Sequence, residues 1–501
     1  MSDSIESNVT GARIAEEATP GVLPATPVWH PVEPNSYNDF GGQITTKARK
    51  PINPTRQRKK GSTTDLDASG GFNQDFTETG LLRLMQGFCF ADADIPGDTQ
   101  PIDGSASVVL TTAVNADSSV NAAAGLDVFS AGDIVLLSGF GVAANNGVKN
   151  VATAAAGKLT FTQAITDEGG LPASARIRKI GQATTDLAIS VAAGVVTVTS
   201  ATEDFLTWPI VEGSWLFFGS DANAFAAPGN ACFARVDSIT SGAMVLGKTS
   251  KQMVAEAAGP AVDVMLPVFV RNQPDEDNIV KRTYQIERTL GRDANGVMSE
   301  YLVQSVPNEL TINVPTADLM TADLSFVSAD AEQRNGATGV KPGTRPVLGV
   351  EDAYNTSSDV KRFKLAVVTD DAYPTALFGY AEEMTITVNN NVTPNKAIGV
   401  LGAFAMTAGT FDVGGSMTVY FNSVDAVQAV RNNTDVTLDL VLVKDNAGWV
   451  FDLPLVALGD GRANVEADQP IKLPLENMAA ESDLGHTLMV ARFEYLPDLA
   501  A

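Results

Sequence analysis

The residues that could form a catalytic or metal-binding set are few and lie far apart in the sequence. His30 and His486 are the only histidines, and Cys89 and Cys232 are the only cysteines. Zinc sites need several Cys or His ligands together, and nucleophilic triads need a histidine beside the nucleophile. We therefore expect both histidines to be surface or packing residues, and both cysteines to be free, buried thiols.

One glycine-rich stretch resembles a cofactor motif. Residues 139–144, Gly-Phe-Gly-Val-Ala-Ala, follow an apolar strand and match the G-x-G-x-x-A dinucleotide fingerprint. The fingerprint works because a helix begins there and its N-terminus holds the pyrophosphate. Here Asn145-Asn-Gly follows instead of a helix, so the stretch predicts a hairpin loop and no bound cofactor.

The acidic residues also fail to define a site. Asp92, Asp94 and Asp98 are spaced like part of a calcium loop, but Pro96 stands at a ligand position and no Glu closes the set. No spacing among the 59 Asp and Glu residues marks a hydrolase pair. The sequence thus predicts a solvated turn at 92–98, no metal, and no enzyme.

Charge and hydropathy exclude further classes of protein. The net charge is −25, with 59 acidic against 34 basic residues, which would repel a polyphosphate. A sequence-reading nucleic-acid binder is therefore not expected. No apolar run approaches roughly 18 residues, and the N-terminus lacks a secretory pattern, which predicts neither a membrane span nor a signal peptide.

The elements with the clearest pattern are strands in the last third of the chain. Residues 309–314 (Glu-Leu-Thr-Ile-Asn-Val) are echoed by 383–388 (Glu-Met-Thr-Ile-Thr-Val), and alternating runs follow at 323–326 and 416–421. Period-2 alternation predicts a sheet with one apolar and one polar face. The polar positions are Glu309, Thr311, Asn313, Asp323, Ser325, Glu383, Thr385, Thr387, Ser416 and Thr418.

Residues 1–60 are predicted to form an extended arm, because repeated prolines disfavour helix and central strand. Val22, Leu23, Val28 and Trp29 would anchor it. A basic run with no acid in it consists of Lys47, Arg49, Lys50, Arg56, Arg58, Lys59 and Lys60. We interpret it as a docking arm for an acidic surface on another copy; the alternative is a solvated loop.

Residues 101–270 contain a weak internal repeat. Residues 129–137 align with 210–218, and 151–157 align with 236–242. This predicts two duplicated β modules, 101–182 and 183–270, inserted into a domain formed by 61–100 and 271–501. Helix is expected in two short segments, 77–88 with Thr77 as N-cap, and from Asn422 or Ser423 to Asn433. The fold class is mostly β, a barrel or sandwich with two short helices and the duplicated insertion.

The order of motifs along the flanks resembles the major tail tube proteins of tailed bacteriophages. The resemblance covers about residues 1–100 and 271–501. The segments that carry it are 15–27, 80–85, 300–306, the two strand repeats, 399–402, 414–421, 452–455 and 473–476. The insertion at 101–270 departs from the minimal family pattern.

The resemblance implies a self-assembling structural virion protein, without catalysis or cofactor. Subunits would form hexameric rings that stack into a tube, and the polar face would line the lumen through which DNA leaves the capsid. Implied partners are other copies of the chain, tape-measure, tail terminator and distal tail proteins, and DNA in transit. The implied location is the virion tail, assembled in the host cytoplasm.

The insertion is too large for such a lumen, so we expect it on the outer wall, where a contractile sheath would have to sit. This favours a long, non-contractile, siphovirus-like tail. Three alternatives stay open. They are an ordinary two-layer β domain, another virion component such as a capsid or tail terminator protein, and an insertion that binds host-surface glycan through Trp208, Trp215 or Phe225. Strand-core packing explains Trp215 better.

Overall fold

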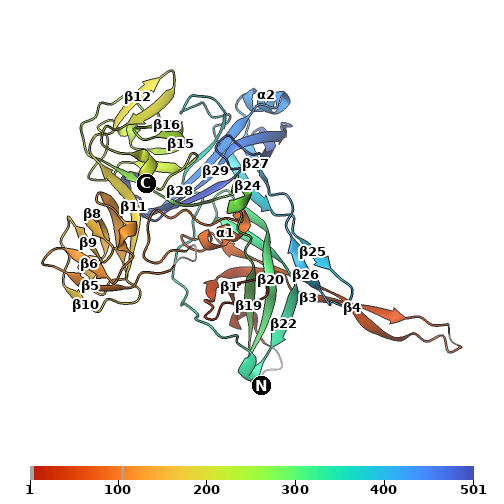
Figure 1. Cartoon of the computed structure of the whole chain (residues 1–501). Helices are drawn as coiled ribbons and strands as arrows, with labels where there is room; N and C mark the ends of the chain where they lie inside the picture. Colours follow the sequence, from red (N-terminus) through yellow and green to blue (C-terminus); the bar gives the residue numbers. More distant parts are fainter. Residues whose placement is uncertain (1–4, 53, 103–105, 501) are drawn as a thin grey trace. The chain divides into compact units, whose positions relative to one another are not determined.

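The computed structural model describes residues 5–52, 54–102 and 106–500. In these residues the chain is mostly β, with antiparallel pairing between strands, one isolated parallel bridge between Val28 and Thr344, two α-helices and several short 3-10 turns, which confirms the predicted fold class (Figure 1). Its contacts divide it into two compact units. The first unit comprises Met1–Phe90, Ile279–Thr356 and Ala381–Thr418, and the second comprises Ala91–Asn278, Ser357–Tyr380 and Val419–Ala501.

These units divide the chain at positions other than the expected domain limits. The strands that follow residue 419 share a unit with the insertion rather than with residues 279–356. The assignment of 61–100 and 271–501 to one domain, with modules at 101–182 and 183–270, stays a prediction.

The first unit is built around the long strand β20 (Gly296–Val314), which serves two sets of neighbours. Its N-terminal part pairs with β19 (Tyr284–Asp293) and β22 (Asp330–Arg334), and its C-terminal part pairs with β21 (Thr321–Ser328) and β24 (Ala381–Asn389). The change occurs at Gln304, whose φ is +52°. The buried Glu17 carboxylate accepts the Gln304 backbone N–H at 3.0 Å and fixes this bend.

The described part of residues 1–60 contains three strands and the start of a fourth, where the sequence predicted one extended arm. β1 (Thr10–Glu16) lies between β19 and β2 (His30–Val32), because its proline-free sequence can pair on both edges. β3 (Pro34–Arg49) forms a long hairpin with β4 (Lys59–Asp75).

The predicted anchors of this segment are only partly buried. Trp29 is fully buried, donates its indole N–H to the Pro342 carbonyl at 3.0 Å, and meets Tyr301 edge-on. Leu23 is half-buried against the same cluster. Val22 and Val28 are exposed, so the anchor prediction was wrong for them.

Helix α1 (Leu82–Cys89) covers the apolar side of β20 and begins later than predicted. Thr77 is not its N-cap, because the segment before the helix forms turns in which Glu351 accepts the Thr79 N–H at 2.8 Å. Gly87 permits the close approach of the helix, since a Cβ there would lie 2.5 Å from the Tyr284 hydroxyl.

In the second unit the two halves of the insertion have the same topology. The first half orders its strands β10 (Glu168–Gly169), β5 (Leu110–Val114), β6 (Ser119–Ala122), β9 (Lys158–Phe161), β8 (Gly147–Ala155), β7 (Asp133–Ser138) and β11 (Arg176–Thr184). The counterpart of β10 in the second half is an isolated bridge between Glu256 and Ile189. The second half orders them β12 (Ala188–Ala192), β13 (Val195–Thr199), β16 (Ala243–Thr249), β15 (Phe233–Thr240), β14 (Trp215–Phe218) and β17 (Val262–Met265). β11 pairs with β17 and joins the two halves into one sheet, in which β7 and β14, like β8 and β15, hold equivalent places.

The insertion shares a core with the C-terminal strands. β23 (Val360–Val367), β28 (Val436–Lys444), β29 (Ala447–Asp460) and β31 (Met489–Phe493) pair in that order. Trp215, Phe217 and Phe233 of the insertion pack against Val450 and Phe493. Helix α2 (Asp425–Asn432) packs on β29, and its bounds are close to the predicted limits. Its C-cap residue, Asn433, has the left-handed conformation.

Candidate functional site

The ten polar positions predicted from strand alternation lie on one continuous sheet face of the first unit. β21, β20, β24 and β27 (Asp412–Tyr420) are consecutive neighbours in the sheet. Thr311 lies between Asp323 on one side and Thr387 on the other. Leu310 and Ile386, which alternate with the polar positions, are buried, so β20 and β24 each have one polar side and one buried apolar side.

Hydrogen bonds across this polar face link the side chains of neighbouring strands. Asn313 donates to the Asp323 carboxylate at 2.8 Å, and Thr418 donates to Glu383 at 3.1 Å. The hydroxyls of Thr385 and Ser416 lie 3.1 Å apart. These short side chains bond to one another along the sheet, which gives a hydrated surface of low relief.

One strand of this face was missed by the sequence reading. β4 pairs with β21, so that Asn73 lies opposite Asp323 and donates to its carboxylate at 2.9 Å. Asp75 is paired with Thr321 and extends the acidic character. Burial alternates from Leu66 to Gly70 and again from Phe72 to Asp75, but the break at the buried Gly71, and the glycines and alanine in this stretch, weakened the signal.

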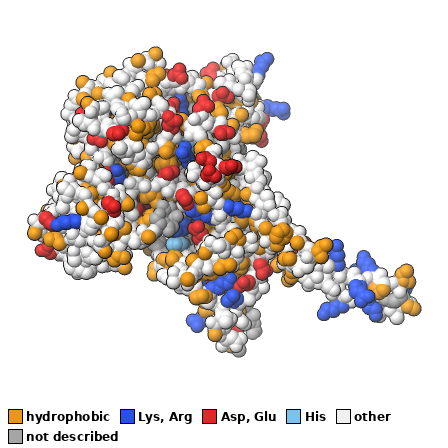
Figure 2. All heavy atoms as spheres, in the orientation of Figure 1, with side chains coloured by type: hydrophobic (Ala, Val, Ile, Leu, Met, Phe, Trp, Pro, Cys, Tyr) orange, Lys and Arg blue, Asp and Glu red, His pale blue; other side chains and the backbone are white. Residues whose placement is uncertain are grey.

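The seven predicted basic residues are all exposed, and they gather at the far end of the β3–β4 hairpin, here called the basic hairpin (Figures 1 and 2). Arg49 is paired with Lys59, and the other five lie beside this pair or in the turn. The pairing of β4 with β21 ends at Ala68, so the distal half of the hairpin has no third strand. At its root, Lys396 bonds Asp65 at 2.6 Å and Asp67 at 2.5 Å.

The glycine-rich loop is a hairpin loop, as predicted, because β7 and β8 pair antiparallel on either side of it. Glu168 accepts the backbone N–H groups of Gly141 at 2.7 Å and Val142 at 3.2 Å. The buried Asn145 donates to the same carboxylate at 3.0 Å. The amides that would hold a phosphate are already bonded to a carboxylate.

The second module repeats this arrangement residue for residue. Glu256 accepts the N–H groups of Ala226 and Ala227, and the buried Asn230 donates to it at 2.8 Å. In both loops the backbone N–H groups are thus already hydrogen-bonded to a glutamate of the same module, which argues for a structural role of the motif. A carboxylate filling a cluster of loop amides leaves no place for an anionic ligand.

The isolated acids, histidines and thiols have ordinary packing roles. Asp98 forms an ion pair with Arg176, and the described residues contain no His, Cys, Asp or Glu group arranged for a metal. Burial, with a smaller contribution from Arg83, lowers the pKa of His30 to about 4. His486 is fully buried, with Nδ1 3.2 Å from the Leu484 carbonyl oxygen.

Both thiols are free and buried. Burial raises the pKa of Cys89 to about 12. Burial also raises the pKa of Cys232 to about 11, because its effect is larger than the opposing effect of the hydrogen bonds to this thiol. Because the thiolate is the reactive form, these cysteines are poor nucleophiles.

The aromatic residues considered for glycan binding are in cores. Trp208, Trp215 and Phe225 are each at most 6% exposed. Trp208 and Phe225 pack inside the second module, and Trp215 packs against the C-terminal strands. The alternative of glycan binding through these three side chains therefore loses its support, and Trp215 has the core position that was expected of it.

A search of curated proteins found no match. Among the described residues, no helix is long and apolar enough to cross a membrane. A family profile described as phage tail tube protein matches residues 7–479, a span that includes the insertion. The chain therefore belongs to the phage tail tube family of structural virion proteins.

Proposed function

We propose that copies of this chain close into hexameric rings, that the rings stack into the tail tube, and that the polar face lines the lumen through which DNA passes. The observation that carries this proposal is the continuity of the ten polar positions across four strands. Closing such sheets into a ring also removes free edges, which otherwise pair uncontrollably.

The chemistry of the face suits a DNA conduit. Among its ten positions three are acidic, Glu309, Asp323 and Glu383, and none is Lys or Arg. The three carboxylates repel phosphate and no cation on the face binds it, so DNA would slide without being held.

The basic hairpin would join subunits of the tube. Its seven cations stand on a chain whose net charge is −25, so acidic surface is available on every other copy. Tape-measure, tail terminator and distal tail proteins would complete the tail, with assembly in the host cytoplasm.

The insertion supports a long, non-contractile, siphovirus-like tail. Its two modules have their own cores and share a third with the C-terminal strands. A body of this size would lie on the outer wall, in the space of a contractile sheath. A cryo-EM map of the virion with a sheath directly on this protein would refute the non-contractile assignment.

The lumen assignment is tested with Thr311→Lys/Thr387→Lys, since these residues are register partners on β20 and β24. Tubes should still form, because both positions are half-exposed, while DNA ejection should slow as lysines bind passing phosphate. Ser190→Lys, at an exposed position of β12, is the matched control. Unchanged ejection from the double variant would show that this face does not line the lumen.

A further inference from the structure

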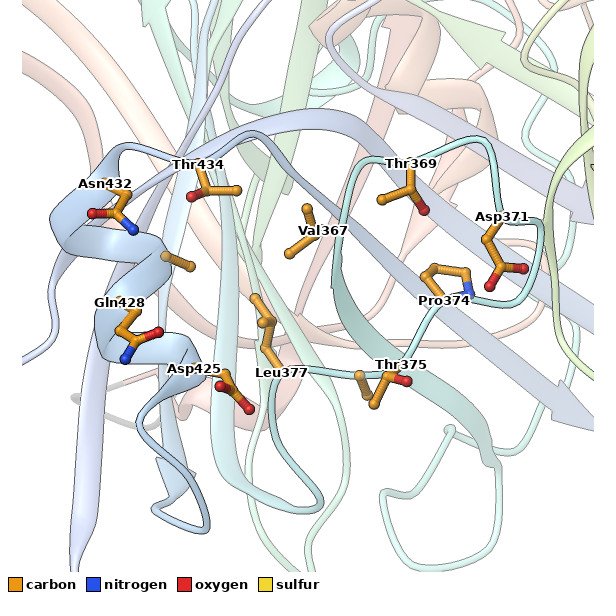
Figure 3. Close-up of a pocket in the computed structure, with 12 residues that line it drawn as sticks. Val367, Thr369, Asp371, Pro374, Thr375, Leu377, Asp425, Gln428, Asn432 and Thr434 are labelled. Atoms are coloured by element: carbon orange, nitrogen blue, oxygen red, sulfur yellow. The ribbon is translucent and has the colours of Figure 1, made fainter. Parts of the chain in front are cut away.

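A groove in the second unit lies between α2 and the loop that follows β23 (Figure 3). Gln428 and Asn432 come from the helix, Thr369 and Asp371 come from the loop, and the side chain of Leu377 lies between the two walls. The remaining lining residues are Val367, Pro374, Thr375, Ala376, Asp425, Ala429 and Thr434.

The groove combines an apolar floor with an acidic rim. Leu377 and Ala429 are buried in the floor, and Asp371 and Asp425 are exposed on opposite walls. Asp370, next to the rim, is also exposed, and no Lys or Arg is among the lining residues. Such a groove suits a small apolar group flanked by cations.

The turn of the basic hairpin has that composition. Ile52 is 106% exposed, as far into solvent as a side chain can be, and in the sequence it lies between Lys50 and Arg56, both of which are exposed. Pro51 and Pro54 restrict the turn, which lowers the entropy lost when it binds.

The hairpin also has a structural need for a partner. A two-stranded ribbon is marginally stable in water unless a third strand or another surface covers it. At roughly 3.3 Å per residue, the stretch from Lys59 to Leu66 spans about 26 Å, enough to reach onto a neighbouring molecule.

We propose that the hairpin turn of one copy docks in the α2 groove of a second copy. Ile52 lies over the Leu377 floor, and Lys50 and Arg56 pair with Asp371 and Asp425. The proposal rests on the proposed function, since it names the surface that receives the basic hairpin when subunits assemble. An acidic patch alone could bind the basic residues at any point along the hairpin. The apolar floor of the groove favours the turn, because the turn carries Ile52.

Directed disulfide formation tests the contact between copies. A chain carrying Ile52→Cys is mixed with a larger, tagged chain carrying Thr375→Cys, and the assembled material is oxidised. Because Cys89 and Cys232 are buried, only the new thiols react. We expect a disulfide-linked heterodimer, and at most a trace when the partner is Met478→Cys, an exposed residue outside the groove.

Negative-stain microscopy of the same mixtures distinguishes the docking proposal from the tube proposal. The docking proposal is overturned, and the tube proposal is not, if tubes form without a disulfide between Ile52→Cys and Thr375→Cys. The same conclusion follows if Ile52→Cys is linked equally well to Met478→Cys. If neither tubes nor rings form and no link appears at high concentration, both proposals fail.

Charge reversal gives an independent readout. Asp371→Lys/Asp425→Lys should raise the concentration needed for assembly roughly tenfold, and Lys50→Glu/Arg56→Glu in the same chain should restore it. Asp127→Lys/Asp483→Lys, a pair of exposed acids outside the groove, should change assembly little. Equal effects of the two aspartate pairs, or no rescue, would contradict docking at this groove.

Discussion

At the scale of single residues, one glutamate and one asparagine hold each of the two equivalent loops of the insertion, Glu168 with Asn145 in the first module and Glu256 with Asn230 in the second. Asn230→Ala removes a fully buried amide that bonds Glu256 and the Val254 backbone. Leaving such partners unsatisfied costs about 1–3 kcal/mol. Urea unfolding should show this loss, and Asn145→Ala in the first module should give a similar one. A loss below about 0.5 kcal/mol, the usual effect of a surface substitution, would contradict the structural role.

Glu256 makes the second of these two loops dependent on pH. Burial raises its pKa, but hydrogen bonds from Ala226, Ala227 and Asn230 outweigh burial, and the net pKa lies below the ordinary 4.5. A lowered folded pKa means that the ionised group stabilises the fold above pH 4.5 and that this contribution is lost as pH falls through the folded value. Glu256→Gln should therefore flatten the stability profile in acid. A parallel profile for variant and wild type would refute this.

The thiols give a second residue-scale prediction. With pKa values of about 12 and about 11, Cys89 and Cys232 should not react with a thiol reagent at pH 8 until the chain is unfolded. Ile52→Cys, at a fully exposed position, should react at once and serves as the positive control. Rapid labelling of the native wild type would contradict the buried placement of both cysteines.

At the scale of elements, the repeated modules offer a matched pair of glycines. Gly132 and Gly213 are equivalent in the repeat and have φ of +88° and +92°. A Cβ at Gly213 would lie 2.2 Å from the buried His486 ring, whereas one at Gly132 would meet the Gln182 amide at 2.9 Å. Gly213→Ala should destabilise by about 1–3 kcal/mol more than Gly132→Ala, because only the first overpacks a core. Equal losses in thermal unfolding would contradict this packing.

The same scale shows what could be predicted from the sequence. Strict alternation at 309–314 and 383–388 was enough to place the six polar positions of these two segments on one face, because one register slip would bury them all. β1 could not be predicted, since its neighbours β19 and β2 lie at very different distances along the chain. The hairpin formed by β3 and β4 was missed because glycines and charged residues obscure the period of both strands.

At the scale of the whole molecule, the insertion is part of a shared core and not a detachable addition. Deleting residues 101–270 would uncover Val450, Met489 and Phe493, which pack under Trp215 and Phe233. Exposing such a face favours aggregation, so we expect the shortened chain in the insoluble fraction. Phe493→Asp should act similarly, and Leu206→Asp, at a 62% exposed position, should not. A soluble deletion variant that still forms tubes would contradict the shared core.

The basic hairpin should control assembly without controlling folding. Removing residues 47–60 trims exposed residues of the turn and spares β1, which a larger N-terminal deletion would destroy. We expect folded monomers or single rings in sedimentation velocity, with an unchanged circular dichroism spectrum. Long tubes from this variant would show that the hairpin is dispensable for assembly.

The most direct measurement of the central claim is a cryo-EM reconstruction of tubes formed by the purified wild-type chain. It should show a closed bore lined by β21, β20, β24 and β27, with Thr311, Asp323, Thr387 and Ser416 facing the axis. A reconstruction in which this face lies on the outer wall, or is buried between subunits, would contradict the account.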